Sequence, residues 1–333
     1  MTFVYDRWTV QLYRIAGIEN LVTEEGVMLQ TATAIETFAA LRERAREAGP
    51  KRLAVVNADE DVALVTASEA LEQGLVHPVL IGDGAVIRAR AETLGLEALL
   101  SSAEIVEAPD PSACAVRMAR EGVVDILLKG HVRTDVLLRA VLDREAGLRT
   151  GPLLSDAYFF EVTRDGRRRL ILSTDGGINV APTLEQKAQI TRNGIAVLQR
   201  LGIPRPKVAI LSATEVVSPS VPSTVDAQAL TRMGEAGELG DAEVFGPLAL
   251  DNALLESAAR EKGITSPVAG HADCLIVPNI EAGNILGKAS KYLGGSSCAH
   301  FIVGTKLPIL ITSRVESSED KLNSVALGVL FAG

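Results

Sequence analysis

Between residues 50 and 143, short apolar runs alternate with stretches of helical periodicity, and this alternation is the strongest constraint on the fold. A first helix over residues 31–48 ends at Gly49-Pro50. When a helix connects each strand to the next, the strands are parallel and the helices cover both faces of the sheet. The sequence therefore predicts an α/β fold, with strands at 53–57, 78–82, 104–107 and 124–128 and helices over 60–73, 85–94, 111–120 and 134–143.

The alternation stops after Arg149. Residues 153–162 and 168–173 have the composition of two strands, and the Asp165-Gly166 pair between them is typical of a hairpin turn. An antiparallel hairpin within such a chain often marks a second domain, so we expect a boundary near residue 150. Beyond the hairpin the alternation resumes, with helices over 183–201, 224–234, 251–261, 282–292 and 320–330 and strands at 208–211, 274–277, 301–303 and 308–312.

Composition excludes several classes of protein. A chain of 333 residues with 47% hydrophobic content is large enough for two domains with sizeable cores. The net charge of −9 argues against a nucleic-acid partner, because phosphate backbones require a basic surface. The three cysteines are far apart, which fits a reducing compartment. Charged residues interrupt the first 20 residues, so we expect neither a signal peptide nor a membrane span, and a cytoplasmic protein.

Familiar cofactor and metal motifs are missing from the sequence. The phrase Gly287-Lys288-Ala289 has alanine where a P-loop needs serine or threonine, and no G-x-G-x-x-G follows the first strand. Histidine pairs with zinc spacing and the G-x-S-x-G nucleophile motif are also missing. These patterns argue against a P-loop, a dinucleotide fold of the usual type, a zinc site and a serine hydrolase.

The stretch 308–320, PILITSRVESSED, offers the clearest chemistry. A predicted strand leads into Ser313 and Arg314 and then into a helix opened by Ser317, and ligands of α/β sheets bind at the carboxyl ends of strands. The guanidinium of Arg314 suits phosphate or carboxylate, and the helix N-terminus adds unpaired N–H groups. Asp320 could serve as a general base, but Ser317-x-x-Asp320 is also the spacing of a capping box, and spacing alone favours the cap.

Four further polar segments, residues 129–131, 174–179, 212–215 and 279–284, follow predicted strands. In a doubly wound sheet such segments line one crevice, which gives the hypothesis of a shared site. Each segment taken alone is better explained as an ordinary loop.

Together with Ser313-Arg314, these segments resemble the phosphate acetyl/butyryl transferase family, and more closely its butyryl branch. The resemblance runs from about residue 50 to the end and is carried by residues 127–151, 174–190, 271–288 and 308–321. It implies a homodimer that reversibly transfers a short acyl group between coenzyme A and inorganic phosphate, with no metal or nicotinamide. Coenzyme A is then a substrate, and no nucleic acid or membrane is involved.

The resemblance also implies a two-domain α/β/α fold of the isocitrate/isopropylmalate dehydrogenase-like type, with a cleft between the domains. Residues 31–150 together with 305–333 would form the first α/β domain. Residues 151–304 would form the second, which contains the hairpin, and residues 1–30 an N-terminal extension.

Site residues follow from the same resemblance. Asp320 would take the proton of the CoA thiol, Arg314 would hold the phosphoryl group, and Ser313 would hydrogen-bond the acyl carbonyl. Burial is expected to raise the pKa of Asp320 toward this task. Arg139 corresponds to a helix arginine used against phosphate, although a solvated surface arginine is the alternative. Further phosphate- or substrate-binding residues would be Lys129, Asn284, Ser212 and Thr214.

Two other functions remain open at this point. The same fold carries NAD-dependent decarboxylating dehydrogenases, but the sequence lacks a recognisable cluster of metal-binding aspartates and a nicotinamide site. A non-catalytic sensor of acyl-CoA or acyl phosphate would bind its ligand without turnover. The acyl group, acetyl or butyryl among others, also stays open, since one methylene in an apolar pocket shifts preference by only ~1–3 kcal/mol.

Overall fold

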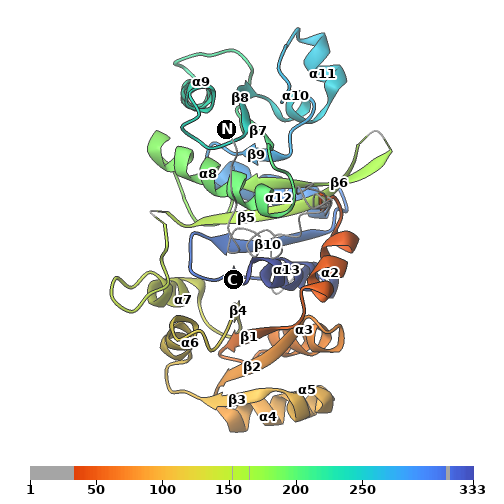
Figure 1. Ribbon diagram of the computed structural model, residues 1–333, viewed down its shortest axis with the longest axis vertical. Helices are drawn as coiled ribbons and strands as arrows, with labels where there is room; N and C mark the ends of the chain where they lie inside the picture. Colours follow the sequence, from red (N-terminus) through yellow and green to blue (C-terminus); the bar gives the residue numbers. More distant parts are fainter. Residues whose placement is uncertain (1–33, 152, 165, 313–315) are drawn as a thin grey trace, which may run out of the picture.

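The computed structural model describes residues 34–151, 153–164, 166–312 and 316–333. Two predicted catalytic residues, Ser313 and Arg314, lie outside the described residues, as does the predicted extension 1–30. In the described part of the chain the strands form one sheet of 11, in the order β3-β2-β1-β4-β11-β10-β5-β6-β9-β7-β8. Figure 1 shows β3 near one end of the long axis and β8 near the other, with β5 and β10 between them.

The first half of the sheet contains parallel strands joined by helices, as predicted. Several helices begin where the sequence supplies a cap: Asp110 accepts a hydrogen bond from the Ala113 N–H, and Pro111 occupies the first turn of α6. The short helix α5 was not predicted. The elements are β1 (Lys51–Val56), β2 (Val76–Gly82), β3 (Glu104–Glu107), β4 (Ile126–Lys129), α2 (Phe38–Glu47), α3 (Asp61–Glu72), α4 (Gly84–Thr93), α5 (Glu97–Ser102), α6 (Pro111–Arg120) and α7 (Thr134–Val141).

The predicted hairpin is confirmed as β5 (Ser155–Arg164) and β6 (Arg167–Thr174). Thr183 and Gln186 form a capping box at the start of α8. Strand β8 was missed, and the helix predicted over 251–261 is two short helices. The remaining elements are α8 (Leu184–Arg200), β7 (Lys207–Leu211), α9 (Pro222–Glu235), β8 (Glu243–Leu248), α10 (Leu250–Leu254), α11 (Glu256–Glu261), β9 (Cys274–Ile276), α12 (Ile280–Tyr292), β10 (Cys298–Val303), β11 (Ile309–Leu310) and α13 (Ser318–Phe331).

Strand direction reverses in the middle of the sheet. Strand β5 is antiparallel to both β6 and β10, and β10 is antiparallel to β11. Strands β1 to β5 and β11 therefore run one way, whereas β6 to β10 run the other way. Residues 129–131 follow a strand of the first set, and the other three polar segments follow strands of the second. A common edge is therefore wrong for residues 129–131, whereas residues 174–179 and 279–284 both contribute to the lining of one pocket.

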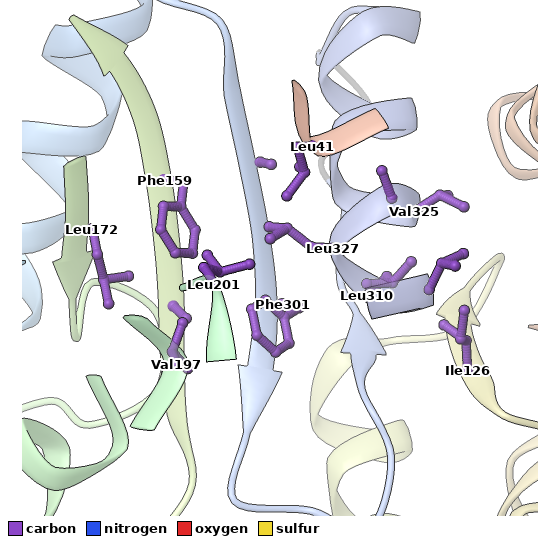
Figure 2. Packing of buried hydrophobic residues seen from close by; sticks show 14 of the residues in the cluster. Leu41, Ile126, Phe159, Leu172, Val197, Leu201, Phe301, Leu310, Val325 and Leu327 are labelled. Atoms are coloured by element: carbon purple, nitrogen blue, oxygen red, sulfur yellow. The ribbon is translucent and has the colours of Figure 1, made fainter. Parts of the chain in front are cut away.

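The C-terminal part of the chain lies at the centre of the sheet. Strand β11 pairs with β4 on one side and β10 on the other, while α13 packs against β10 and α2. Figure 2 shows Phe159 and Leu172 of one half, Phe301 of β10, and Leu310, Val325 and Ile126 of the other half within one apolar cluster. The boundaries of the two expected domains stay a prediction.

In the part of the chain that the structure describes, no helix has both the length and the apolar character needed to cross a membrane.

Candidate active site

A pocket of about 190 Å³, here called the α12 pocket, lies between α12 and the strands β5, β6 and β10. Asn284 is the predicted site residue that lines it. The full lining consists of Asp156, Tyr158, Ser173, Gly176, Gly177, Gly283, Asn284, Gly287, Lys288, Lys291, Tyr292, His300 and Glu316.

Two glycines allow the loop after β6 to touch the first turn of α12. A Cβ atom on Gly283 would lie 2.6 Å from the Cα of Gly176, so neither position has room for a side chain. Asp175 holds this loop by accepting hydrogen bonds from the N–H groups of Gly177 and Ile178, each at 2.9 Å. Burial, and then the nearby Asp156 carboxylate, raise the pKa of the Asp175 carboxyl. The predicted polar segment 174–179 thus shapes one wall of the pocket.

His300 lies in the pocket wall between two carboxyl groups. Its Nδ1 is 3.4 Å from Asp156 Oδ1, and its Nε2 is 3.3 Å from Glu316 Oε1. Burial by itself would lower the pKa of the imidazole, but the two carboxyl groups outweigh it and raise the pKa to about 10. His300 is therefore a cation at neutral pH, and it ties β5 and β10 to the chain just before α13.

Tyr158 completes this wall. Its ring centroid is 5.8 Å from that of His300, and its hydroxyl donates a 3.0 Å hydrogen bond to the Gly287 carbonyl of α12. Burial raises the pKa of the Tyr158 hydroxyl, so the group stays a neutral donor. The contact fixes α12 over the sheet and so sets the width of the pocket.

Asp320 occupies the third position of α13 and is 2% exposed. The predicted capping box is confirmed: the Asp320 N–H donates to Ser317 Oγ at 3.3 Å, and the Ser317 N–H donates to the Asp320 carboxylate at 3.3 Å. The carboxylate also accepts hydrogen bonds from the Ser317 hydroxyl at 2.6 Å, from the Cys298 N–H at 2.8 Å and from the Lys291 ammonium.

These donors decide the acidity of Asp320. Burial alone would raise the pKa of the carboxyl, but the hydrogen bonds from Lys291, Ser317 and Cys298 outweigh it and hold the pKa below its usual value. The expectation of a raised pKa is therefore wrong for this arrangement. The physical reason is that the buried carboxylate is surrounded by charged and polar hydrogen-bond donors, which stabilise its ionised form.

Lys129 lies in a different place from Asn284. It ends β4, and its ammonium donates to the carbonyls of Gly130 and Val132, each at 3.2 Å. A second pocket of about 410 Å³, here called the α7 pocket, is lined by Lys129, His131, Val132, Arg133, Thr134 and Asp135.

Arg139, on α7, has a side chain that is 79% exposed and 3.8 Å from Asp135, and it lies outside the lining of the α7 pocket. Its position is therefore that of a solvent-exposed arginine on the surface of a helix.

Ser212 and Thr214 make local contacts after β7. The Ser212 hydroxyl is 2.8 Å from that of Ser223, and Thr214 Oγ1 accepts a hydrogen bond from the Val216 N–H at 3.3 Å. Neither residue lines the α12 pocket or the α7 pocket. Of the described site predictions, Asn284 lines the α12 pocket and Asp320 reaches it through Lys291.

Sequence reasoning missed Lys291, His300 and Glu316. A histidine within the apolar run of β10, CAHFIV, was the available signal for one of them. In the described residues, no group of three histidine, cysteine or acidic side chains is arranged to hold a metal ion. The expected independence from metals remains a prediction.

Comparison with known proteins shows the family of the chain. The family model described as phosphate acetyl/butaryl transferase matches residues 99–329. The chain belongs to this family. A phosphate butyryltransferase of Clostridium beijerinckii is 39% identical over 300 residues, which covers 89% of this chain and 98% of that protein. The predicted family is thus confirmed, and the chain is an acyltransferase.

Solved structures support the family's fold. The crystal structure of a branched-chain phosphotransacylase from Enterococcus faecalis is 31% identical, with a TM-score of 0.75 over 85% of this chain and 99% of that one. A putative 4-hydroxythreonine-4-phosphate dehydrogenase from Salmonella typhimurium shares the fold at 13% identity, with a TM-score of 0.53 over 85% of this chain and 100% of that one. The predicted fold class, of the dehydrogenase-like type, is confirmed. The dehydrogenase and sensor functions gain no support from these relatives.

Proposed function

We propose that this acyltransferase exchanges a short acyl group between coenzyme A and inorganic phosphate, so that acyl-CoA and phosphate give acyl phosphate and CoA. Membership of the family supports the chemistry. The observation that carries the assignment to this site is the buried Asp320 carboxylate, which Lys291 connects to the α12 pocket.

Asp320 is the proposed base. In the direction that forms acyl-CoA, the thiol proton moves to a carboxylate oxygen of Asp320 as the sulfur forms a bond to the acyl carbon. The bond from that carbon to the phosphate oxygen then breaks, and phosphate leaves. A free thiol with a pKa near ~8.5 is mostly protonated at neutral pH, and general-base help of this kind is worth roughly 10²- to 10⁴-fold.

The other residues take supporting roles in this proposal. Arg314 would hold the phosphoryl group and Ser313 the acyl carbonyl as it becomes tetrahedral. Asn284 would contact substrate in the α12 pocket, which it lines. Lys129, at the end of β4, and Arg139, on α7, would attract the phosphate groups of the substrates. Ser212 and Thr214 have the least support, because their hydroxyls already make local hydrogen bonds.

The test is phosphate-dependent release of free CoA from acetyl-, propionyl-, butyryl- and isobutyryl-CoA, followed with a thiol reagent, with and without EDTA. We expect release that requires phosphate and is unchanged by EDTA, and the panel ranks the acyl groups. Binding of acyl-CoA without release from any of them would favour the sensor. Inhibition by EDTA would contradict the proposed independence from metals.

We further propose that the enzyme is a cytoplasmic homodimer. Ile285 and Tyr292 of α12 and Leu293, directly after this helix, are 67%, 57% and 88% exposed, and exposed apolar patches mark interaction surfaces. Cys114, Cys274 and Cys298 are free and buried, as in proteins of reducing compartments. Sedimentation of the purified protein at the mass of one chain would contradict the dimer, and cell fractionation tests the compartment.

A further inference from the structure

The Asp320 carboxylate is held by donors of two kinds. The Ser317 N–H, the Ser317 hydroxyl and the Cys298 N–H belong to the cap of α13 and to β10, which are fixed parts of the fold. Lys291 instead reaches the carboxylate with a long, flexible side chain from the last turn of α12. If the ammonium moved away, the other donors would still hold the carboxylate in place.

Lys291 lies between the carboxylate and the α12 pocket. Its side chain lines the pocket and is 17% exposed, whereas Asp320 is outside the lining. The charged or titratable groups that face the ammonium are Asp320 of α13, Cys298 of β10 and Glu316, and Glu316 is itself 3.3 Å from the imidazole of His300. A molecule in the pocket therefore meets the ammonium before it meets the carboxylate.

The pocket has room for a tetrahedral anion. Its volume of about 190 Å³ is several times the ~30 Å³ that one water occupies in the liquid. Lys288, one turn before Lys291 on α12, adds a second ammonium to the lining, and the Asn284 amide adds neutral donors. The two carboxylates of the lining, Asp156 and Glu316, are both engaged with His300.

We propose that Lys291 is a positioning residue that couples substrate phosphate to the base: a phosphate in the α12 pocket takes over its ammonium and so releases the Asp320 carboxylate to accept a proton. This inference rests on the proposed role of Asp320. It resolves a conflict in the site, because a carboxylate that keeps four donors is a poor acceptor for the proton of a thiol. Withdrawal of the ammonium and the approach of an anion both make the carboxylate more basic.

Competition for one ammonium has a reciprocal consequence, because binding couplings act equally in both directions. The experiment is calorimetric titration of the full-length protein with inorganic phosphate at pH 8, without acyl-CoA. Asp320→Asn should bind phosphate about fivefold or more tightly, because the competitor for Lys291 has lost its charge. Lys291→Met should bind phosphate about tenfold more weakly, which corresponds to ~1.4 kcal/mol.

Two control variants separate this effect from general charge and from misfolding. Lys306→Met removes the same charge from an exposed position outside both pockets and should weaken phosphate binding less than about threefold. Lys291→Arg keeps the charge and should stay within about threefold of the wild type. Circular dichroism melting confirms that each variant is folded before it is titrated.

The outcomes separate this inference from the proposed function. Unchanged or weaker phosphate binding by Asp320→Asn overturns the inference, even if acyl transfer is observed. Opposite shifts in the two variants, with no acyl transfer from any acyl-CoA by the wild type, support the exchange at Lys291 and overturn the proposed function. A wild type that does not bind phosphate overturns both.

Discussion

Asp320 is both a helix cap and a buried carboxylate near a pocket. The spacing in the sequence presents a cap and a general base as alternatives, but the structure allows one residue to be both. Its role as a base makes the first prediction. Asp320→Asn keeps the shape but loses the proton acceptor, so turnover of acyl-CoA should fall by roughly 10²- to 10⁴-fold while acyl-CoA binding survives. Steady-state CoA release and calorimetry measure the two effects.

The matched control is Glu319→Gln, because Glu319 is an acid of the same helical turn with a side chain that is 59% exposed. It should keep near-normal turnover. If Asp320→Asn also kept it, Asp320 would act only as a cap.

His300 makes a prediction about pH. Its pKa is raised from ~6.5 in the unfolded chain to about 10 in the fold, so its stabilising effect is complete below ~6.5 and is lost as the pH rises toward 10. Between pH 7 and 9 the free energy of unfolding of the wild type should fall by about 1.4 kcal/mol per pH unit relative to His300→Gln. Urea unfolding at several pH values measures the slope, and parallel slopes would mean that His300 is not the charged partner of Asp156 and Glu316.

At the scale of elements, the contact between the loop after β6 and the start of α12 depends on two glycines. Gly283→Ala would place a Cβ 2.6 Å from a backbone carbon of Gly176, so one segment must shift. Overpacking of this kind costs ~1–3 kcal/mol, and we expect a lower melting temperature together with a higher KM for substrate.

Gly151→Ala is the control for this change, because a Cβ there would meet no atom within 4 Å. An unchanged KM in Gly283→Ala would separate this contact from substrate binding.

The same scale shows what a sequence can reveal about this fold. The helix predicted over 183–201 was found as α8 because its long apolar period is a local signal, and the structure adds a capping box at its start. Strand β8 was missed because Gly246-Pro247 interrupts it, and glycine and proline normally weaken a strand. The Asp320 cap could be predicted because the spacing from Ser317 to Asp320 is also a local signal. The pocket was not, because His300 meets Asp156 through the pairing of β10 with β5, and the reversal of strand direction there leaves no local trace.

At the scale of the whole molecule, one apolar cluster joins the two halves of the sheet (Figure 2). Phe301, 1% exposed, lies in its middle and contacts Phe331 with ring centroids 4.6 Å apart. Phe301→Ala should reduce the free energy of unfolding by ~3–5 kcal/mol. Because the cluster is shared, hydrogen exchange in β1 and in β7 should accelerate by a similar factor. Acceleration in only one of these strands would mean that the halves unfold independently.

The order in which the sheet is assembled has a consequence for synthesis of the protein. Strands β10 and β11 and helix α13 occupy the centre of the molecule, yet they come later in the chain than both halves that they join. A ribosome releases the flanking halves first, with an unfilled gap between them and apolar side chains exposed on both sides. The nascent chain should therefore need protection by chaperones until residues 298–331 leave the exit tunnel, and translation that stops before them should leave a product prone to aggregation.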